Sequence, residues 1–262
     1  MFVALTIAGS DPSGGAGLQA DLKTFHQHGV FGTSVVTLLT VQNTRDVSEV
    51  RGVDSHFVAR QLRAVLEDLR PAAVKTGALG SPETVQVVAD LVAETGLRLV
   101  VDPVMISTHG ARLTNEDAHR AVTDRLLPHA LLVTPNLAEA ATLCGFPVAS
   151  PADMAAAARV IADFGAANVL VKGGHLAGQP LDILLSGNGL QHLEGERIKT
   201  HHTHGTGCVY SAAITARLAR GESLLDAVQG AKRFVTEAIR TNPGLGSGQG
   251  PTNMFVDGDS DS

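Results

Sequence analysis

The sequence lacks a surplus of basic residues and any long hydrophobic run. Its 26 acidic residues outnumber 20 basic ones, giving a formal net charge of −6 over 262 residues. General binding to nucleic acids needs a basic face, so this balance argues against it and leaves room only for a local basic pocket. No stretch approaches the roughly 18 apolar residues of a membrane span. The apolar start MFVALTIAG is short and carries no basic leader, so we expect no membrane contact.

Cysteine is also scarce, with Cys144 and Cys208 as the only two. One disulfide is compatible with this number, but a disulfide-framed secreted scaffold is not. Apolar residues make up 44% of the chain and charged residues 18%, which suits a substantial core and argues against global disorder. We therefore expect a soluble, cytoplasmic protein.

Two common nucleotide-binding signatures are missing as well. There is no G-x-x-x-x-G-K-[ST] loop, and the glycines of GSDPSGGAG (9–17) do not meet the G-x-G-x-x-G spacing of dinucleotide-binding proteins. No acidic residue ends the second apolar run, where a ribose ligand is expected. The run HHTH (201–204) has a spacing that can bind a metal, but no matching cluster occurs elsewhere, so we interpret it as a polar loop.

Short apolar runs alternate with amphipathic stretches along most of the chain. The runs are continuous in Val, Leu and Ile, which is typical of strands covered on both faces in a parallel sheet. In the amphipathic stretches, apolar residues fall on one helical stripe. We expect strands in 3–8, 34–39, 72–77, 98–104, 130–135 and 168–174, and helices in 54–69, 81–95, 115–126, 151–164 and 208–241, the last broken near Gly221.

This order predicts an α/β fold with a mostly parallel central sheet flanked by helices on both faces. No linker or internal repeat divides residues 1–255, which we assign to one domain. The tail VDGDSDS (256–262) is acidic and poor in core-forming residues, so we expect it to be disordered.

In open α/β sheets, ligands bind beyond the carboxyl ends of the strands. The polar residues that directly follow the apolar runs are therefore the candidates for a site. They are Gly9-Ser10-Asp11, Gln42-Asn43, Lys75-Thr76, Asp102, Asn136 with Glu139, and Lys172-Gly173-Gly174.

The segment THGTGC (203–208) precedes a helix-like run and has the properties of an anion pocket. Gly205 and Gly207 allow a tight turn that brings backbone N–H groups close to a ligand. A helix that begins near Gly207 adds its unsatisfied amides and the positive end of its dipole. The same field is expected to lower the pKa of Cys208 and favour the thiolate. An ordinary glycine-rich turn before a helix is the alternative.

Three further strand ends carry charged or amide side chains. Lys172 precedes two glycines and is placed to clamp a phosphate, although a surface lysine is an equal reading. Asn136 and Glu139 lie on one face of a helix that begins after Pro135, where they serve either as a helix cap or as Mg²⁺ ligands through water. Asp102 is a second acidic candidate that faces the same crevice.

Six segments together resemble one known family. They are ALTIAGSDPSGGAGLQADLKTFHQHGVFGTSVVTLLTVQNT (4–44), VKTGALG, VVDPVM, TPNLAEA, VLVKGGHL and THGTGC. In this order and spacing, from about residue 3 to 255, the chain resembles the hydroxymethylpyrimidine/phosphomethylpyrimidine kinases. These are thiamin-biosynthesis enzymes of the ribokinase-like superfamily.

The resemblance implies a homodimer that uses ATP and Mg²⁺ to phosphorylate the hydroxymethyl group of the pyrimidine, and then the resulting monophosphate. It implies direct in-line transfer with Cys208 as the base, in a position where sugar-kinase relatives have an aspartate. Lys172, Gly205, Thr206 and Gly207 would hold nucleotide phosphates, with Asp102, Asn136 and Glu139 arranging Mg²⁺ and water. The pyrimidine pocket would comprise Gly9, Ala16, Asp21, Gln42 and Val104.

The chain departs from the family pattern at a few positions. Ala78 stands where methionine is common, which opens one wall of the expected pyrimidine pocket. Ser247 and Gln249 replace frequent histidines, and His201-His202 replaces a lead-in that usually contains asparagine. Two alternatives to the pyrimidine kinase remain open: a pyridoxal kinase with the same cysteine motif, and a non-catalytic pyrimidine-binding sensor.

Overall fold

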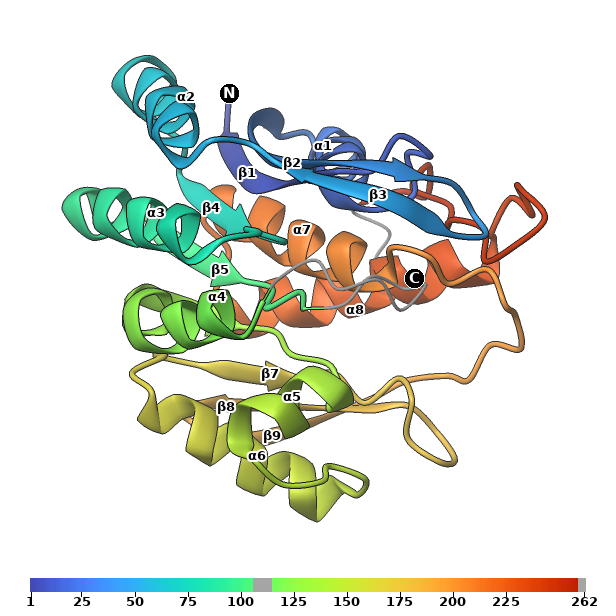
Figure 1. Ribbon diagram of the computed structural model, residues 1–262. Coiled ribbons are helices and arrows are strands. Elements are labelled where there is room, and N and C mark those ends of the chain that lie inside the picture. Colours follow the sequence, from blue (N-terminus) through green and yellow to red (C-terminus); the bar gives the residue numbers. More distant parts are fainter. Residues whose placement is uncertain (106–114, 259–262) are drawn as a thin grey trace.

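The computed structural model describes residues 1–105 and 115–258. These residues form a nine-stranded sheet in the order β3-β2-β1-β4-β5-β6-β7-β8-β9, with helices on both faces (Figure 1). The strands from β2 to β7 are parallel, whereas β3, β8 and β9 add antiparallel edges. The strands are β1 (Val3–Ser10), β2 (Phe31–Gln42), β3 (Val47–Gly52), β4 (Ala73–Thr76), β5 (Arg98–Val101), β6 (Ala130–Val133), β7 (Val169–Val171), β8 (Leu181–Ser186) and β9 (Gly189–Glu194).

Two layers of helices cover this sheet. The α-helices of the described residues are α1 (Gly17–Gln27), α2 (Ser55–Asp68), α3 (Pro82–Thr95), α4 (Glu116–Ala121), α5 (Leu137–Cys144), α6 (Pro151–Asp163), α7 (Thr206–Ala219) and α8 (Leu224–Arg240). The predicted helix 115–126 divides into α4 and a π-helical turn, Val122–Leu126. The predicted α/β fold with a mostly parallel sheet is confirmed.

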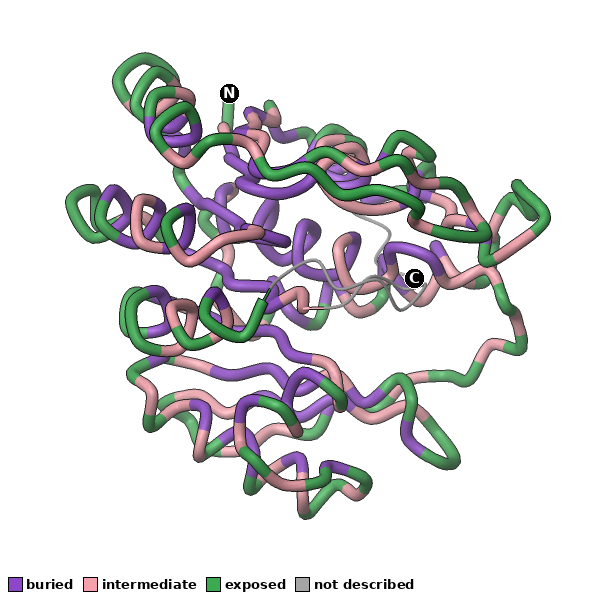
Figure 2. Tube along the Cα trace, viewed as in Figure 1, coloured by how far each residue is buried: buried purple, intermediate pink, exposed green. Residues whose placement is uncertain are grey.

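Alternate residues of the central strands pack into different cores, which explains why those strands read as continuous apolar runs. In β5, Leu99 and Val101 pack with α2, α3 and α6 on one face of the sheet. Val100 packs with α1, α7 and α8 on the other. Figure 2 shows the resulting buried centre of the sheet between half-buried helices. Each strand residue thus contributes apolar surface to a core, which is the main driving force for this architecture.

The ends of the parallel strands are joined in a row by backbone hydrogen bonds. The Gly77 amide donates to the Ile7 carbonyl at 2.9 Å, and the Asp102 amide donates to the Thr76 carbonyl at 3.0 Å. The Lys172 amide donates to the Pro135 carbonyl at 2.8 Å. The loops that follow β1, β4, β5, β6 and β7 therefore lie side by side along one edge, where the sequence places its polar residues.

The helices of the two layers differ in how they begin. At α2, α3, α6 and α8 the N-cap side chain accepts a backbone hydrogen bond. The N-caps of α1 and α7 are Ala16 and Gly205, and neither provides a side-chain cap. A helix start without a side-chain cap keeps first-turn amides available to another partner, except at Thr206, whose amide donates to the Thr203 carbonyl at 3.2 Å.

The carboxyl-terminal segment packs on the body of the protein as far as the structure describes it. Val256 is buried in the core of α7 and α8, and the Gly258 carbonyl accepts from Arg217 Nη1 at 3.0 Å. Residues 259–262 of the tail predicted to be disordered lie outside the described residues. In the described ranges, no helix combines the length and the apolarity needed to cross a membrane.

Candidate active site

The THGTGC turn packs tightly against the glycine-rich loop that follows β1. Gly205 has φ of +76°, and a Cβ at this position would come within 1.8 Å of the Gly15 carbonyl oxygen. Both conditions exclude any other residue at position 205. The turn delivers the uncapped start of α7 to the strand-end edge, as the sequence predicted. Thr206 turns its Oγ1 back into the loop, where it donates to the Thr203 carbonyl at 2.7 Å.

Lys172 lies directly beside this helix start. A Cβ on Gly207 would stand 3.3 Å from Lys172 Nζ and 3.9 Å from Asp102 Oδ2. Lys172 Nζ lies 2.9 Å from Asp102 Oδ1, and its side chain stays 12% exposed. Burial would lower the pKa of Lys172, but the negative charges of Asp102 and Glu139 raise it above its usual value. The structure thus brings together a permanent cation and the amides of α7, which is the chemistry of a phosphate site.

Asp102 is held from three directions. Besides Lys172, Thr134 Oγ1 donates to its Oδ1 and Ser211 Oγ donates to its Oδ2, each at 3.1 Å. It occupies the end of β5 at only 2% exposure. These three donors fix the orientation of the buried carboxylate.

Asn136 and Glu139 form the capping box of α5. Asn136 Oδ1 accepts from the Glu139 amide at 2.9 Å, and Glu139 Oε2 accepts from the Asn136 amide at 2.8 Å. The capping role left open by the sequence is therefore present. Burial raises the pKa of Glu139 to about 7, against the lowering effect of Lys172. This buried carboxylate therefore titrates near neutral pH.

Cys208 does not have the lowered pKa that its sequence position suggests. Burial raises the pKa of its thiol to about 11, and neither the charge of Lys75 nor a hydrogen bond from the Gly17 amide compensates. The expectation of a thiolate was wrong because the thiol is enclosed between α1 and α7, where removal of water disfavours the charged form. At neutral pH the residue is a thiol.

A second lysine, Lys75 of β4, was among the strand-end candidates, but the sequence analysis gave it no role and no partner. Its Nζ lies 2.9 and 2.8 Å from the two carboxylate oxygens of Asp21, which also accepts from Thr6 Oγ1 at 2.6 Å. Neither partner has an exposed side chain. In the sequence, the sign of a buried lysine was its position inside the otherwise apolar run AAVKTG. Asp21, predicted to contact the pyrimidine, is instead engaged on both oxygens in the interior, and its predicted contact with a ligand is untested.

Gln42, Gly9, Ala16 and Val104 remain the predicted acceptor-site residues. Gln42 ends β2 and is partly exposed, and its amide reaches His204. The Ala16 amide donates to Asp11 Oδ2 at 2.9 Å. Asp11 was a strand-end candidate, but its pairing with His204 was not predicted, because 193 residues separate the two partners of this hydrogen bond. Histidine 204 therefore belongs to a buried network and not to a surface loop.

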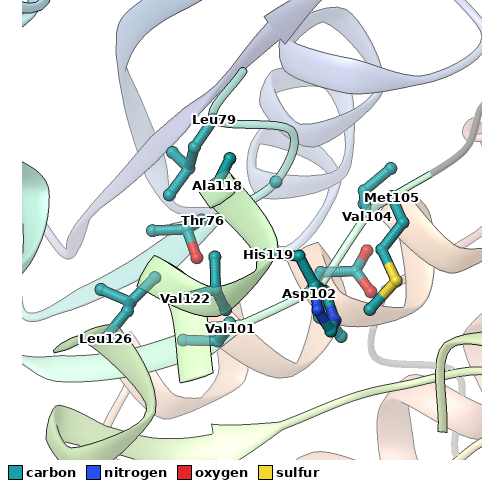
Figure 3. Close-up of a pocket in the computed structure, with 12 residues that line it drawn as sticks. Thr76, Leu79, Val101, Asp102, Val104, Met105, Ala118, His119, Val122 and Leu126 are labelled. Atoms are coloured by element: carbon teal, nitrogen blue, oxygen red, sulfur yellow. The ribbon is translucent and has the colours of Figure 1, made fainter. Parts of the chain in front are cut away.

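A cavity adjoins the site beneath the end of β5. Asp102, Val104 and Met105 line it together with Thr76 and His119, as Figure 3 shows. Within the described part of the chain, Thr76 Oγ1 and His119 Nε2 are buried without a hydrogen-bond partner. Burial lowers the pKa of His119, so this imidazole is neutral. Val104, a predicted pyrimidine contact, thus lines a mostly apolar cavity beside Asp102.

Comparison with known proteins assigns the chain to a family. Residues 11–253 match the phosphomethylpyrimidine kinase family. A hydroxymethylpyrimidine/phosphomethylpyrimidine kinase of Rhizobium meliloti is 49% identical over 97% of both chains. A crystal structure of a phosphomethylpyrimidine kinase from Clostridium difficile 630 is 40% identical, with a TM-score of 0.81 over 91% of this chain and all of the other.

A pyridoxal kinase from Staphylococcus aureus, solved with AMP-PCP and pyridoxal, is also similar. It is 36% identical with a TM-score of 0.90, over 97% of this chain and 94% of the other. The predicted ribokinase-like fold and the predicted kinase class are confirmed by these likenesses. The match over nearly the whole chain, together with the lysine, glycine turn and cysteine gathered at one sheet edge, shows that the protein is a member of the phosphomethylpyrimidine kinase family.

Proposed function

We propose that the protein phosphorylates hydroxymethylpyrimidine with ATP, and then phosphorylates the monophosphate to the diphosphate, in cytoplasmic thiamin biosynthesis. The likeness to the hydroxymethylpyrimidine/phosphomethylpyrimidine kinase of Rhizobium meliloti supports the two acceptors, and the AMP-PCP complex of the pyridoxal kinase supports ATP as the donor. The observation that carries the proposal is the meeting of Lys172 Nζ with Gly207, at the uncapped start of α7.

The phosphoryl group is proposed to transfer directly, in line, from ATP to the acceptor oxygen. The amides of the N-cap Gly205 and of Gly207 in the first turn of α7 would form the anion hole, and Lys172 would neutralise the charge that spreads over the phosphoryl oxygens. Gly207 keeps this hole open, because a side chain there would approach Lys172. No covalent phosphocysteine is required.

The acidic residues at the edge fit Mg²⁺ that arrives with a nucleotide. Mg²⁺ prefers oxygen ligands, keeps several waters and is bound by one or two carboxylates together with substrate phosphates. Asp102 and Glu139 would supply the carboxylates and Asn136 a further oxygen through water, while no group of three metal-binding side chains occurs among the described residues. When bound, the ion would neutralise phosphate charge during transfer.

Cys208 is the residue we assign to the acceptor proton. With a pKa of about 11, roughly one thiol in 10⁴ is deprotonated at pH 7. The thiolate is a strong base but a scarce one, and it suffices if the hydroxyl loses its proton late, after the acceptor oxygen has engaged the phosphorus. The expected signature is a kcat/KM that continues to rise between pH 7 and 10.

An ADP-release assay with a panel of acceptors tests the assignment, with each product identified by mass. Hydroxymethylpyrimidine and its monophosphate are expected to be the best acceptors. A much larger kcat/KM for pyridoxine would replace the assignment with the pyridoxal kinase, which the likeness to the Staphylococcus aureus enzyme supports. Tight pyrimidine binding without ADP formation in the presence of Mg²⁺ would indicate a sensor.

Ala78 and the sheet edge add two finer proposals. Ala78 is 7% exposed, so a small residue here leaves space in the pyrimidine pocket that Ala78→Met would fill, with a change in acceptor KM.

We also propose a homodimer that covers the exposed apolar side chains of the β2–β3 edge, Leu39, Val41 and Val50. Light scattering during gel filtration that gives a monomer mass would overturn the dimer.

A further inference from the structure

Asp11 and His204 form a buried pair that joins the two glycine-rich loops of the site. His204 Nε2 lies 2.8 Å from Asp11 Oδ2, and the two side chains are 1% and 4% exposed. Gln42, at the end of β2, reaches the same ring nitrogen, with its Nε2 3.3 Å away. The predicted pyrimidine-reading amide is thus in contact with a hydrogen-bond network that begins at a carboxylate.

Asp11 determines where His204 carries its proton. Burial would raise the pKa of Asp11, but hydrogen bonds from His204 and Ser13 outweigh it and the net shift is downward. The carboxylate is therefore ionised at neutral pH and can only accept hydrogen bonds. A separation of 2.8 Å between this oxygen and His204 Nε2 requires a hydrogen on that nitrogen.

The N–H of His204 in turn determines how the Gln42 amide is oriented. An amide NH₂ group and an imidazole N–H group are both donors, so they do not form a hydrogen bond with each other. A half-turn about the terminal bond of Gln42 brings its Oε1 to the same place, 3.3 Å from His204 Nε2, where it accepts the longer branch of a three-centre hydrogen bond that this N–H shares with Asp11. The oxygen and nitrogen of an amide are nearly the same size, so this half-turn needs no other movement.

Thr40 supports the same orientation from the other side of the amide. Its Oγ1 donates to the Ser10 carbonyl at 2.9 Å, which uses its single hydrogen. The same Oγ1 lies 3.2 Å from the amide of Gln42. With its hydrogen already committed, Thr40 is an acceptor and pairs with the amide nitrogen of Gln42. The contacts with His204 and with Thr40 therefore favour the same orientation of the Gln42 amide.

We propose that His204 and Asp11 are positioning residues that hold the Gln42 amide with its oxygen toward His204, and so select the acceptor substrate. The proposal rests on the function proposed above and deepens it. A held amide presents an oxygen and an N–H group in a fixed order. An aminopyrimidine edge, with an exocyclic N–H beside a ring nitrogen, complements that order. A pyridine such as pyridoxine has no amine beside its ring nitrogen and does not.

The test compares His204→Phe with His204→Gln. Phenylalanine keeps an aromatic ring and removes the N–H, whereas glutamine places an amide N–H near the position of Nε2. His204→Phe should raise the KM for hydroxymethylpyrimidine about tenfold, the effect of losing one oriented hydrogen bond. The KM for ATP should stay within about twofold, and His204→Gln should restore most of the acceptor KM. His204→Asn, whose amide ends short of Nε2, is a second loss variant if His204→Phe does not fold.

Two controls separate orientation from general damage. His28→Phe replaces another buried histidine, which contacts Thr24 O through Nδ1 at 2.8 Å. It should lower stability without changing the preference for hydroxymethylpyrimidine over pyridoxine. In a Gln42→Ala background, His204→Phe should have no further effect on that preference, because the amide through which it acts is gone.

Equal changes in all KM values, or the same loss of preference with and without Gln42, would overturn the positioning role. If the wild-type protein does not phosphorylate hydroxymethylpyrimidine, the proposed function fails, but the positioning role of His204 can still be tested by ligand binding. Calorimetric binding of hydroxymethylpyrimidine and pyridoxine to the wild type and to His204→Phe then decides it, since an unchanged affinity ratio contradicts it.

Discussion

Two lysine–aspartate pairs lie at the strand-end edge, and they differ in what surrounds them. Lys75 and Asp21 are sealed, with both side chains 0% exposed and both carboxylate oxygens engaged. Lys172 and Asp102 are open on the lysine side, where the ammonium group faces Gly207. The same pair of residue types therefore serves two purposes. The sealed pair fixes charge and structure beneath the site, and the open pair keeps a cation available to a ligand.

Breaking the sealed pair should have the largest effect. Lys75→Met leaves Asp21 buried without its counter-ion, and we expect a loss of about 3–5 kcal/mol in the free energy of unfolding. The double variant Lys75→Met/Asp21→Leu should recover most of this loss, because no uncompensated charge remains. Urea unfolding followed by circular dichroism measures both. A double variant as unstable as the single one would show that the pair does more than balance charge.

Glu139 gives a second test of the comparison, because its charge interacts with Lys172 and Asp102 of the open pair. Its pKa is about 7 in the folded protein, compared with an ordinary value of 4.5. A raised pKa stabilises the fold below pH 4.5 and loses that contribution as the pH rises through 7. Glu139→Gln retains the capping box and should gain roughly 3 kcal/mol relative to the wild type between pH 4.5 and 8.

Urea midpoints of the ligand-free protein across this pH range measure the effect. Glu67→Gln, at an exposed position of α2, is the matched control and should track the wild type. A constant difference between Glu139→Gln and the wild type would contradict the raised pKa.

Removing the open cation should affect catalysis more than stability. Lys172→Ala takes away the positive charge at the phosphoryl position, and we expect about a 10²-fold loss in kcat/KM for ATP. Asp102 keeps its bonds from Thr134 and Ser211, so the free energy of unfolding should change little. Steady-state kinetics and urea unfolding on one sample give both numbers. A stability loss as large as that of Lys75→Met would erase the distinction between the two pairs.

Cys208 lies in the field of both pairs and should show the smallest of these effects. Cys208→Ala should retain ATP binding and lose roughly tenfold in kcat, less than a fully ionised base would cost. It should also flatten the rise of kcat/KM toward alkaline pH, because the group with a pKa of about 11 is gone. Unchanged turnover, or an unchanged pH profile, would show that Cys208 only fills space.

The sequence predicted the parallel core of the sheet because each central strand is buried on both faces, and this leaves an unbroken apolar run. It did not predict β3, β8 and β9. At the two outer strands, β3 and β9, edge position lets polar residues such as His192 and Glu194 enter the strand. Short edge strands of mixed composition differ little from loops in a single sequence.

The site was predictable where its chemistry is local and hidden where it depends on burial or on distant partners. The anion pocket of Gly205 and Gly207 follows from backbone properties that the sequence carries directly. The pKa of Cys208 depends on enclosure by α1, from the other end of the chain, and so its direction was predicted wrongly. Lys75 was recognised as a strand-end residue, but its partner lies 54 positions away.

The fit of Gly205 against the Gly15 carbonyl also has a consequence for how the protein is made. The two loops are joined near opposite ends of the chain, as the 193-residue separation of Asp11 and His204 shows. A ribosome-bound chain can pair β1 with β2 early, but it cannot complete the phosphate pocket until α7 has emerged. Contacts between residues that are so far apart in the sequence form late in folding. Recovery of activity should therefore lag behind recovery of helical signal during refolding.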